Sequence, residues 1–362
     1  MIDRKLRAIA FVLPQFHPIP ENDAWWGKGF TEWTNVTKAK PLFEGHYQPH
    51  LPTDLGFYDL RLPEARQAQA KMAKDYGIHG FCYYHYWFNG NRLLHQPIDG
   101  MLNQKELDMP FMFCWANENW TRRWDGKEDD VLMKQVYSFE DDKAHMRWLC
   151  EYVFSDDRYI RVNDCPVFMV YRFDLFPDIN QTVKLWREIA VNEYGYKGLY
   201  LCITESFGIQ QNPEEIGFNA NVEFPPHYIL NNKKVLERKR TLKEFLGFNK
   251  VKGLQIRDLE KGVVQYMARN KANYKLYKCV VPSWDNTARK GNLGVIGYGS
   301  SPKLYYEWLK ATLEDFKPYS EDENFIFINA MNEWAEGNHL EPCIKYGRAY
   351  LEATYNALKD YV

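Results

Sequence analysis

Short runs of consecutive apolar and aromatic residues recur along the chain, separated by segments of mixed character. The runs do not alternate with polar residues, which is typical of strands that are buried on both faces of a parallel sheet. Eight such runs predict eight strands: Ala8–Leu13, Gly80–Tyr84, Phe111–Trp115, Val167–Tyr171, Leu199–Thr204, Ala220–Phe224, Lys278–Pro282 and Phe325–Asn329.

The segments between these runs carry apolar residues at helical spacing. Ser138 and the pair Ser301–Pro302 are typical of helix starts, because serine caps free amide groups and proline fits the first turn. The connection between the fifth and sixth strands is short and only weakly helical around Asn212–Ile216. The predicted helices are Leu62–Tyr76, Phe139–Phe154, Asn180–Glu193, Asp258–Asn270, Pro302–Phe316 and Tyr346–Leu358.

Eight strands that alternate with helices predict an α/β protein, a single (β/α)8 TIM barrel over residues 1–362. The alternative is an open doubly wound sheet, which would carry a glycine-rich phosphate turn after its first strand. The chain has Pro14-Gln15-Phe16-His17 at that position. The barrel is therefore favoured over the open sheet.

Two connections are long, one after the first strand and one after the sixth. Residues 14–52 are rich in aromatic side chains, and residues 225–257 form a basic insertion. Long loops on a barrel usually surround its active face. The insertion is interpreted either as a solvated helical hairpin or as a lid that meets an acidic glycan or a phosphate-bearing carrier.

Charge and composition narrow the class of protein. Apolar residues make up 45% of the chain and charged residues 26%, with a net charge of -2. This balance is typical of a globular protein and gives no electrostatic reason to expect a nucleic-acid partner. No stretch approaches 18 apolar residues, and the first residues enter a strand without a signal-like region, so no integral membrane segment is expected.

Cysteine and histidine spacing bears on redox compartment and metal binding. The seven cysteines are odd in number and never occur at C-x-x-C spacing, and no H-E-x-x-H pattern is present. Such cysteines are typical of small buried residues in a reducing compartment. We therefore expect a cytoplasmic protein with no metal and no cofactor.

Aromatic, carboxylate and amide residues gather where the predicted strands end. Aromatic residues reach 16% of the chain. Flat rings pack against sugar C–H faces, and carboxylates, amides and guanidinium groups bind sugar hydroxyls, so this mixture predicts an oligosaccharide or polysaccharide site. The candidate substrate-binding residues are His17, Trp26, Glu32, Trp33, Tyr84, His85, Tyr86, Trp115, Asn117, Glu118, Trp120, Tyr171, Arg172, Glu205, Glu223, Trp284, Asp285, Asn332 and Trp334.

Glu333 and Glu336 stand three residues apart where the last strand opens into its loop. Glycosidic cleavage needs one carboxylic acid to protonate the leaving oxygen and a second carboxylate as base or nucleophile. A tight turn would aim both side chains into the barrel mouth. A second interpretation stays open, in which Glu333 is a strand-end hydrogen-bonding residue and Glu336 caps the following turn.

Four segments resemble one protein family. They are Phe16–Asp23, Trp26–Trp33, Asn117–Trp120 and Asn332–Pro342, and together they are similar to the WbsX family of glycoside hydrolase family 99-like domains. The resemblance extends from about Ile9 to about Tyr346. It implies a (β/α)8 glycan-active enzyme encoded among bacterial surface-polysaccharide genes.

The resemblance to family 99 also implies roles for the two glutamates. In its Asn-Glu-Trp-x-Glu-Gly motif, Glu333 would take a proton from the sugar 2-hydroxyl, whose oxygen attacks C1 to form a 1,2-anhydro sugar. Glu336 would protonate the leaving oxygen and then activate water, so the configuration is retained. Position 335 is alanine, where family 99 enzymes tend to carry a larger polar residue, so linkage specificity does not transfer.

Two other functions remain as alternatives. A glycosyltransferase of lipopolysaccharide or O-antigen biosynthesis would usually show an Asp-x-Asp after a strand or a glycine-rich diphosphate loop, and the chain has neither. A carbohydrate-binding pseudoenzyme would not need both Glu333 and Glu336. A retaining endo-acting glycoside hydrolase is the favoured function, and a carrier-linked glycan would suit the basic insertion.

Overall fold

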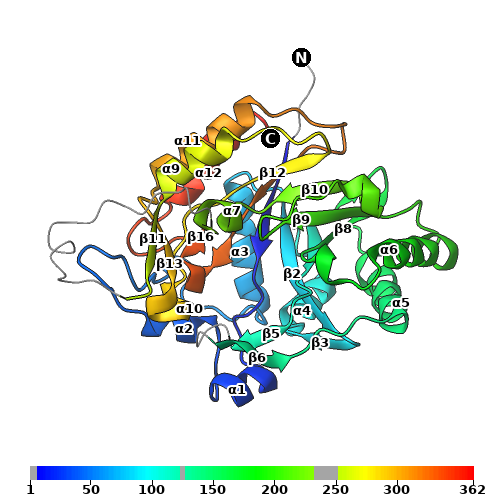
Figure 1. The fold of residues 1–362 in the computed structure, drawn as a ribbon, viewed down its shortest axis with the longest axis horizontal. Helices are drawn as coiled ribbons and strands as arrows, with labels where there is room; N and C mark the ends of the chain where they lie inside the picture. The colour runs from blue at the N-terminus through cyan, green and yellow to red at the C-terminus, as the bar shows by residue number, and fades with distance from the viewer. Residues whose placement is uncertain (1–5, 123–126, 232–251) are drawn as a thin grey trace.

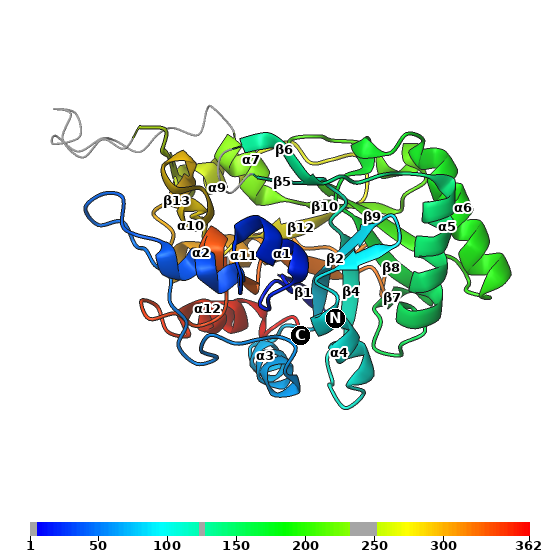
Figure 2. The ribbon, with the colours of Figure 1, turned by 90° about the horizontal axis from the view of Figure 1, so that it is seen from below.

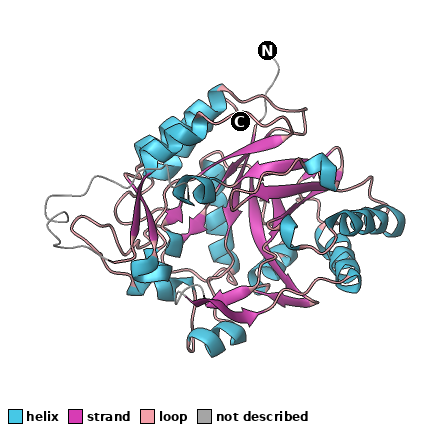
Figure 3. Cartoon of the chain, in the orientation of Figure 1, coloured by secondary structure: helices cyan, strands magenta, loops and turns pink. Residues whose placement is uncertain are grey.

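The computed structural model describes residues 6–122, 127–231 and 252–362 of the chain. Within them, eight strands pair in parallel, and β1 pairs with both β2 and β14, which closes the sheet into a barrel. Figure 3 shows the strands at the centre with helices around them. The predicted (β/α)8 TIM barrel is confirmed, with strands β1 (Arg7–Val12), β2 (Gly80–Phe88), β4 (Phe111–Trp115), β8 (Cys165–Val170), β9 (Tyr200–Glu205), β10 (Ala220–Glu223), β12 (Leu276–Val280) and β14 (Phe325–Ile328).

Helices occupy most of the connections and surround the barrel in both ribbon views (Figures 1 and 2). Every predicted helix is present, and α5 and α6 each end in a π-helical turn. The sequence did not predict α4 (Gln96–Asn103), which follows β2. The six predicted helices are α3 (Pro63–Asp75), α5 (Phe139–Trp148), α6 (Ile179–Glu188), α9 (Leu259–Met267), α11 (Pro302–Glu314) and α12 (Ala349–Leu358).

The connection between β9 and β10, residues 206–219, is short as predicted. It holds a single 3-10 turn, η5 (Pro213–Ile216), where the other barrel connections place longer helices. Pro213 starts this turn and Gly217 ends it with a φ of 76°, a left-handed conformation that favours glycine. The outer wall of β9 and β10 is therefore left for side chains and neighbouring loops to cover.

Two long connections lie on the carboxyl side of the strands, as expected. The one after β1 carries α1 (Pro20–Trp26) and α2 (Glu32–Lys38), and the one after β10 carries α7 (Pro225–Asn231) and β11 (Gln255–Asp258). Of the basic insertion, residues 232–251 lie outside the described residues.

Short elements complete the carboxyl side. Strand β11 pairs in parallel with β13 beside α10, and an antiparallel hairpin, β5–β6, follows β4. None of the helices in the three described segments combines the length and apolar character needed to cross a bilayer. The remaining elements are β3 (Asn91–Leu93), β5 (Trp120–Arg122), β6 (Lys127–Met133), β7 (Arg161–Val162), η3 (Phe173–Leu175), α10 (Thr287–Lys290), η6 (Gly291–Leu293), β13 (Val295–Tyr298), β15 (Asn332–Glu333), η7 (Trp334–Glu336) and β16 (Asn338–His339).

Aromatic side chains fill the interior of the barrel. The Phe11 ring of β1 lies 5.6 Å from the ring of Tyr84, 5.9 Å from that of Phe224 and 5.9 Å from that of Phe327. These residues come from β2, from the end of β10 and from β14, so one layer of rings spans the barrel. This layer closes the barrel beneath its carboxyl end.

The outer side of the strands packs against helices, and one substitution there tests this packing. Phe168 of β8 is fully buried against Phe154 and Trp186. We expect Phe168→Ala to lower the free energy of unfolding by about 3–5 kcal/mol, because it leaves a cavity in the core. Tyr355→Ala, at an exposed site on α12, should change it by less than about 0.5 kcal/mol. Equal losses in chemical denaturation would contradict this account of the core.

Candidate active site

A cavity of about 520 Å³ opens at the carboxyl ends of the barrel strands. Five of its lining residues, Leu13, Ala116, Tyr171, Phe224 and Asn329, are each the first residue after a barrel strand. Active sites of TIM barrels lie at this end, because the strand ends and the βα loops converge there. The cavity is thus in the position where catalytic residues are expected.

Glu333 and Glu336 both line this cavity. After β14 the chain forms β15, the single turn η7 and β16, which pairs antiparallel with β15. Gly337 ends the turn with a φ of 55°, and a Cβ there would lie 2.9 Å from the Cβ of Asp285. Glycine is therefore needed on two counts for the turn that presents both glutamates.

The turn is supported from below by buried polar contacts. The indole of Trp334 donates to Glu341 at 2.7 Å and stacks on His339 with ring centroids 3.8 Å apart. Tyr58 and Gln69 also donate to Glu341, at 2.8 and 2.7 Å. Three donors satisfy this buried carboxylate, and burial raises its pKa to about 7. These contacts hold Trp334 in the core, and Trp334 lies between Glu333 and Glu336 in the sequence.

Arg289 of α10 joins the two glutamates. Its Nη2 donates to Glu333 Oε2 at 2.8 Å, and its Nη1 lies 2.8 Å from Glu336 Oε1. The same Nη2 donates to Glu32 Oε1 of α2, also at 2.8 Å. One guanidinium group therefore contacts three carboxylates, one from α2 and two from the turn that follows β14.

Burial controls the protonation of the pair. It raises the pKa of Glu333 to about 8, although Arg289 opposes the shift, and it also raises the pKa of Glu336. The Glu333 side chain is 8% exposed and that of Glu336 is 22% exposed. Because the two buried carboxylates lie close together and share Arg289, their titrations are coupled, and burial favours the protonated form of each.

Nine of the predicted site residues lie together at the cavity. The aromatic members come from the loop after β1, from β2, from the β5–β6 hairpin and from the ends of β8 and β12. The Glu118 carboxylate is 2.5 Å from Arg172, which also pairs with Asp174 at 2.7 Å behind it. The nine are Trp26, Tyr84, Tyr86, Glu118, Trp120, Tyr171, Trp284, Glu333 and Glu336.

Several predicted aromatic contacts lie in the core and not at the described cavity lining. Along β2, Tyr84 and Tyr86 reach the cavity, while His85 between them points to the other face and stacks on Trp148, because successive side chains of a strand alternate. Trp115 is fully buried and Trp33 packs on Trp334. The predicted aromatic residues placed in the core are Trp33, His85, Trp115 and Trp334.

Predicted amides hold the loops of the site. Asn332 accepts the Leu13 amide N–H at 2.7 Å and donates to its carbonyl at 3.0 Å, which ties the last loop to the first. Asn117 binds the backbone of Arg172 in the same two-sided way, at 2.8 and 2.7 Å. Both asparagines are fully buried. They shape the mouth without lining the cavity.

Other predicted polar contacts are buried behind the cavity wall. His17 is fully buried, and burial lowers its pKa to about 4. Asp285 bonds to His46 at 2.7 Å and accepts the Thr287 hydroxyl at 2.6 Å. Glu32 has no exposed surface. These three side chains are therefore shielded from a molecule in the cavity.

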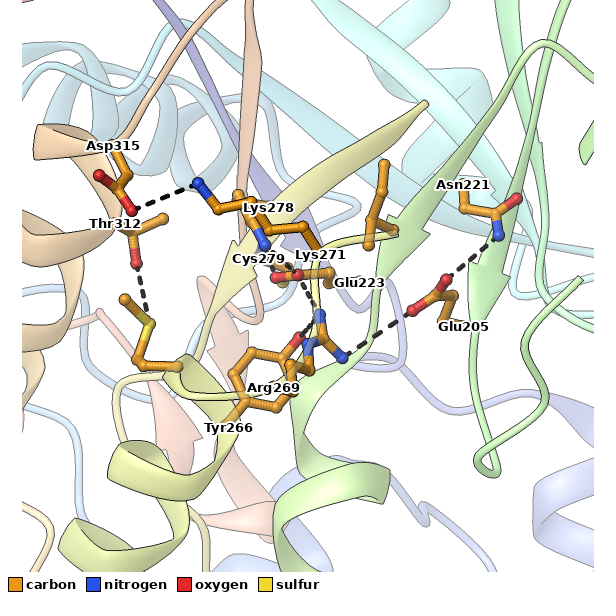
Figure 4. A network of polar contacts seen from close by, with 12 residues as sticks. Glu205, Asn221, Glu223, Tyr266, Arg269, Lys271, Lys278, Cys279, Thr312 and Asp315 are labelled. Atoms are coloured by element: carbon orange, nitrogen blue, oxygen red, sulfur yellow. Dashed lines mark hydrogen bonds and ion pairs between the residues drawn. The ribbon is translucent and has the colours of Figure 1, made fainter. Parts of the chain in front are cut away.

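Glu205 and Glu223 belong to a different part of the barrel. They are opposite one another on β9 and β10, and both point toward Arg269, as Figure 4 shows. Glu223 also accepts from Lys278 at 2.7 Å, and Glu205 accepts from Asn221 at 3.2 Å. This ion network covers the wall that the short β9–β10 connection leaves without a helix, and Phe224, the next residue, lines the cavity instead.

Sequence analysis missed other residues at the cavity. Arg289 lies five residues after Trp284 in the sequence. Charge balance could have pointed to it, because two buried carboxylates need a cation close to them. Phe224 was assigned to the sixth strand itself. The missed lining residues include Gln15, Asn119, Thr121, Phe207, Phe224, His227, Asn286, Arg289 and Lys290.

The sequence family of the chain is established by comparison. The chain belongs to the WbsX family, described as glycosyltransferase WbsX, which matches residues 8–354. Two relatives from strains of Xanthomonas campestris pv. campestris, both described as uncharacterized protein WxcX, are 43% identical over 351 residues, or 97% of this chain and 49% of theirs. The chain spans about half the length of these curated relatives. The predicted family is thus confirmed.

Solved structures share the fold at low sequence identity. The GH99 endo-alpha-mannosidase from Bacteroides thetaiotaomicron has a TM-score of 0.57 at 14% identity, covering 98% of this chain and 97% of that one. A glycoside hydrolase-like protein has a TM-score of 0.62 at 13% identity, covering 99% and 95%. The likeness shows that this chain shares its overall fold with these two proteins.

The glycine at the end of the turn that carries Glu333 and Glu336 offers a matched test. Gly337 and Gly347 have left-handed φ values of 55° and 53°, but a Cβ would contact Asp285 only at the first. Gly347→Ala should cost about 1–2 kcal/mol of unfolding free energy from backbone strain alone. Gly337→Ala should cost clearly more and displace the glutamates. Thermal unfolding of both variants checks this, and equal losses would show that the Asp285 contact is unimportant.

Proposed function

We propose that this chain is a retaining, endo-acting glycoside hydrolase that cleaves a bacterial surface polysaccharide or its precursor. The observation that carries the proposal is the placement of Glu333 and Glu336 on one turn, facing one cavity and joined by Arg289. Binding alone would not require two buried carboxylates, since their burial is costly. Acid–base chemistry does require them.

In the first chemical step, one glutamate of the pair acts as a base and the other as an acid. Glu333 takes the proton of the sugar 2-hydroxyl, and the 2-oxygen attacks C1 as the C1–oxygen bond to the leaving group breaks. Glu336 gives its proton to that leaving oxygen. The product is a 1,2-anhydro sugar, with Glu333 protonated and Glu336 ionised.

The second step restores the starting state. Glu336 takes a proton from water, whose oxygen bonds to C1 as the C1–O2 bond breaks, and Glu333 returns a proton to O2. Two inversions at C1 give net retention. Both steps fit a pair that holds one proton throughout.

Burial favours a proton on Glu333, which is the more buried of the two carboxyl groups. A sugar hydroxyl that donates to Glu333 stabilises its ionised form, and the proton then moves to Glu336. Substrate binding thereby creates the acid and the base together.

Aromatic side chains provide the sugar-binding surface. Trp26, Trp120 and Trp284 line the cavity from three separate segments, and Tyr84 of β2 and Tyr171, which follows β8, line it as well. Rings of this kind pack against pyranose faces. Glu118, held by Arg172, supplies a carboxylate for sugar hydroxyls.

A glycosyltransferase is the second candidate, because the WbsX family carries that description. The deciding experiment is mass spectrometry of α-linked oligosaccharides incubated with the protein, with and without nucleotide sugars. Shortened glycans support the hydrolase. Glycans lengthened only with a nucleotide sugar present support the transferase, and binding without either change supports the pseudoenzyme.

Substitution of the pair separates catalysis from binding. Glu333→Gln and Glu336→Gln should each lower the rate of glycan cleavage by about 10²–10⁴-fold, because each removes one proton-transfer group. Glycan affinity, measured by calorimetry, should change little because amide and carboxyl have nearly the same shape. Cleavage at near wild-type rates in both variants would rule out the assigned roles.

The pH dependence of kcat/KM follows from the raised pKa values. The active pair carries one proton, and burial raises the pKa of Glu333 to about 8. The rate should hold below this pH and fall as the pH rises through about 8, when the shared proton is lost. A rate that keeps rising beyond pH 9 would contradict the one-proton pair.

A further inference from the structure

Glu32 reaches the catalytic turn from the other end of the chain. It is the first residue of α2, has no exposed surface, and is absent from the described lining of the cavity. Its Oε1 accepts from Arg289 at 2.8 Å and from the backbone N–H of Ala335, between the catalytic glutamates, at 2.9 Å. Glu32 therefore contacts Arg289 and the turn that carries the two glutamates, but it does not reach the cavity in which a substrate would bind.

The side chains that are bonded directly to one another at this turn carry more negative than positive charge when all are ionised. Glu32, Glu333 and Glu336 face the single guanidinium of Arg289, so full ionisation leaves two uncompensated negative charges. Uncompensated charge is costly where side chains are buried. One proton on the catalytic pair lowers the excess to one negative charge, whereas the same group without Glu32 would reach that balance with no proton at all.

Among the described residues, few other charges influence the pair from the surrounding elements. Lys290 of α10 favours ionisation of Glu336, but it is partly exposed and therefore screened by solvent. Tyr84 and Tyr86 of β2 lie close to Glu333, and burial raises the pKa of both, so they stay neutral. Glu32 and Arg289 are thus the charges with the strongest influence on the pair.

We propose that Glu32 and Arg289 are opposed positioning residues, in which Arg289 holds the two catalytic carboxylates together and Glu32 keeps one shared proton on them. The inference rests on the proposed function for its meaning in catalysis. It changes the expected role of Glu32 from a sugar contact to a residue that acts through Arg289 and the catalytic turn.

Stability alone does not explain this arrangement. Buried ion pairs are often replaced by apolar groups of similar shape with no loss of stability. Glu32 Oε2 has no hydrogen-bond donor among the described residues, which is a costly way to hold a loop. A carboxylate is nevertheless present at this position, and an apolar residue could not supply its negative charge.

The first test follows kcat/KM against pH in variants of opposite charge. Glu32→Gln removes a negative charge and should move the alkaline limb to lower pH by about 1–3 units, whereas Arg289→Gln should move it to higher pH. Arg289→Lys keeps the charge and should leave the limb in place. Since Glu32 does not reach the cavity, Glu32→Gln should lower kcat by about 10–100-fold with KM nearly unchanged.

The second test needs no substrate. A carboxylic acid whose pKa is raised by folding stabilises the protein at low pH, and that stability is lost as the pH rises through the folded value. The Tm of the wild type should therefore fall between pH 5.5 and 8.5, and the fall should be smaller in Glu32→Gln. Asp54→Asn, which removes a carboxylate from the surface pair with Arg348, is the matched control and should follow the wild type.

The two readouts separate failure of the inference from failure of the proposed function. Shifted pH limbs and a reduced fall in Tm support the inference. A reduced fall in Tm without cleavage of any glycan supports the charge balance and overturns the hydrolase. Unshifted limbs in active Glu32→Gln, or parallel Tm curves, overturn the inference while the hydrolase stands.

Discussion

The parallel pairing of β1 with β14 is the interaction on which the rest of the molecule depends. It places Ala10 opposite Ile328 and turns an open sheet into a barrel. It also brings together loops from the two ends of the chain, so Asn332 binds the backbone of Leu13 and Ala335 binds Glu32. Without this closure, Glu32 would belong to a separate surface from Glu333 and Glu336.

Closure lets the barrel bury charge at one end while its interior stays apolar. The layer of rings around Phe11 forms an aromatic floor. Above it the carboxylates are bonded to one guanidinium, and Glu32 also accepts from the backbone amide of Ala335. Low polarity below the cluster strengthens each of these interactions. The same burial makes every unbalanced charge costly, and this cost favours protonation of Glu333 and Glu336.

The fold was predictable from sequence because each barrel strand is a continuous apolar run. Such a run can be recognised without knowledge of tertiary contacts. The placement of Glu333 and Glu336 at one cavity was predictable for a similar reason, since the two residues are close in sequence. Side-chain direction was not: His85 and Glu223 stand beside lining residues but fall on the opposite face of their strands. Which face of the sheet a side chain points to depends on the residue at which the strand leaves the sheet. The sequence does not show where that residue is.

Arg289 and Glu32 show a second limit of sequence reasoning. Neither lies near the glutamates in the chain, and their role follows only from contacts between three loops. Glu32 was predicted as a sugar contact because it follows the first strand, but this position could not distinguish a ligand contact from a buried counter-charge. Burial, a three-dimensional quantity, decides between the two.

The hydrogen bond between the Leu6 amide and the Tyr361 carbonyl, 2.8 Å long, lies at the amino end of β1. Residues 6 and 361 therefore meet at the amino ends of the barrel strands, whereas the cavity lies at their carboxyl ends. Positions that lie this close can be joined by a short linker, and the chain can then be opened in a surface loop. A circular permutation that joins residues 6 and 361 is accordingly compatible with the barrel, and the junction would lie on the side away from the cavity.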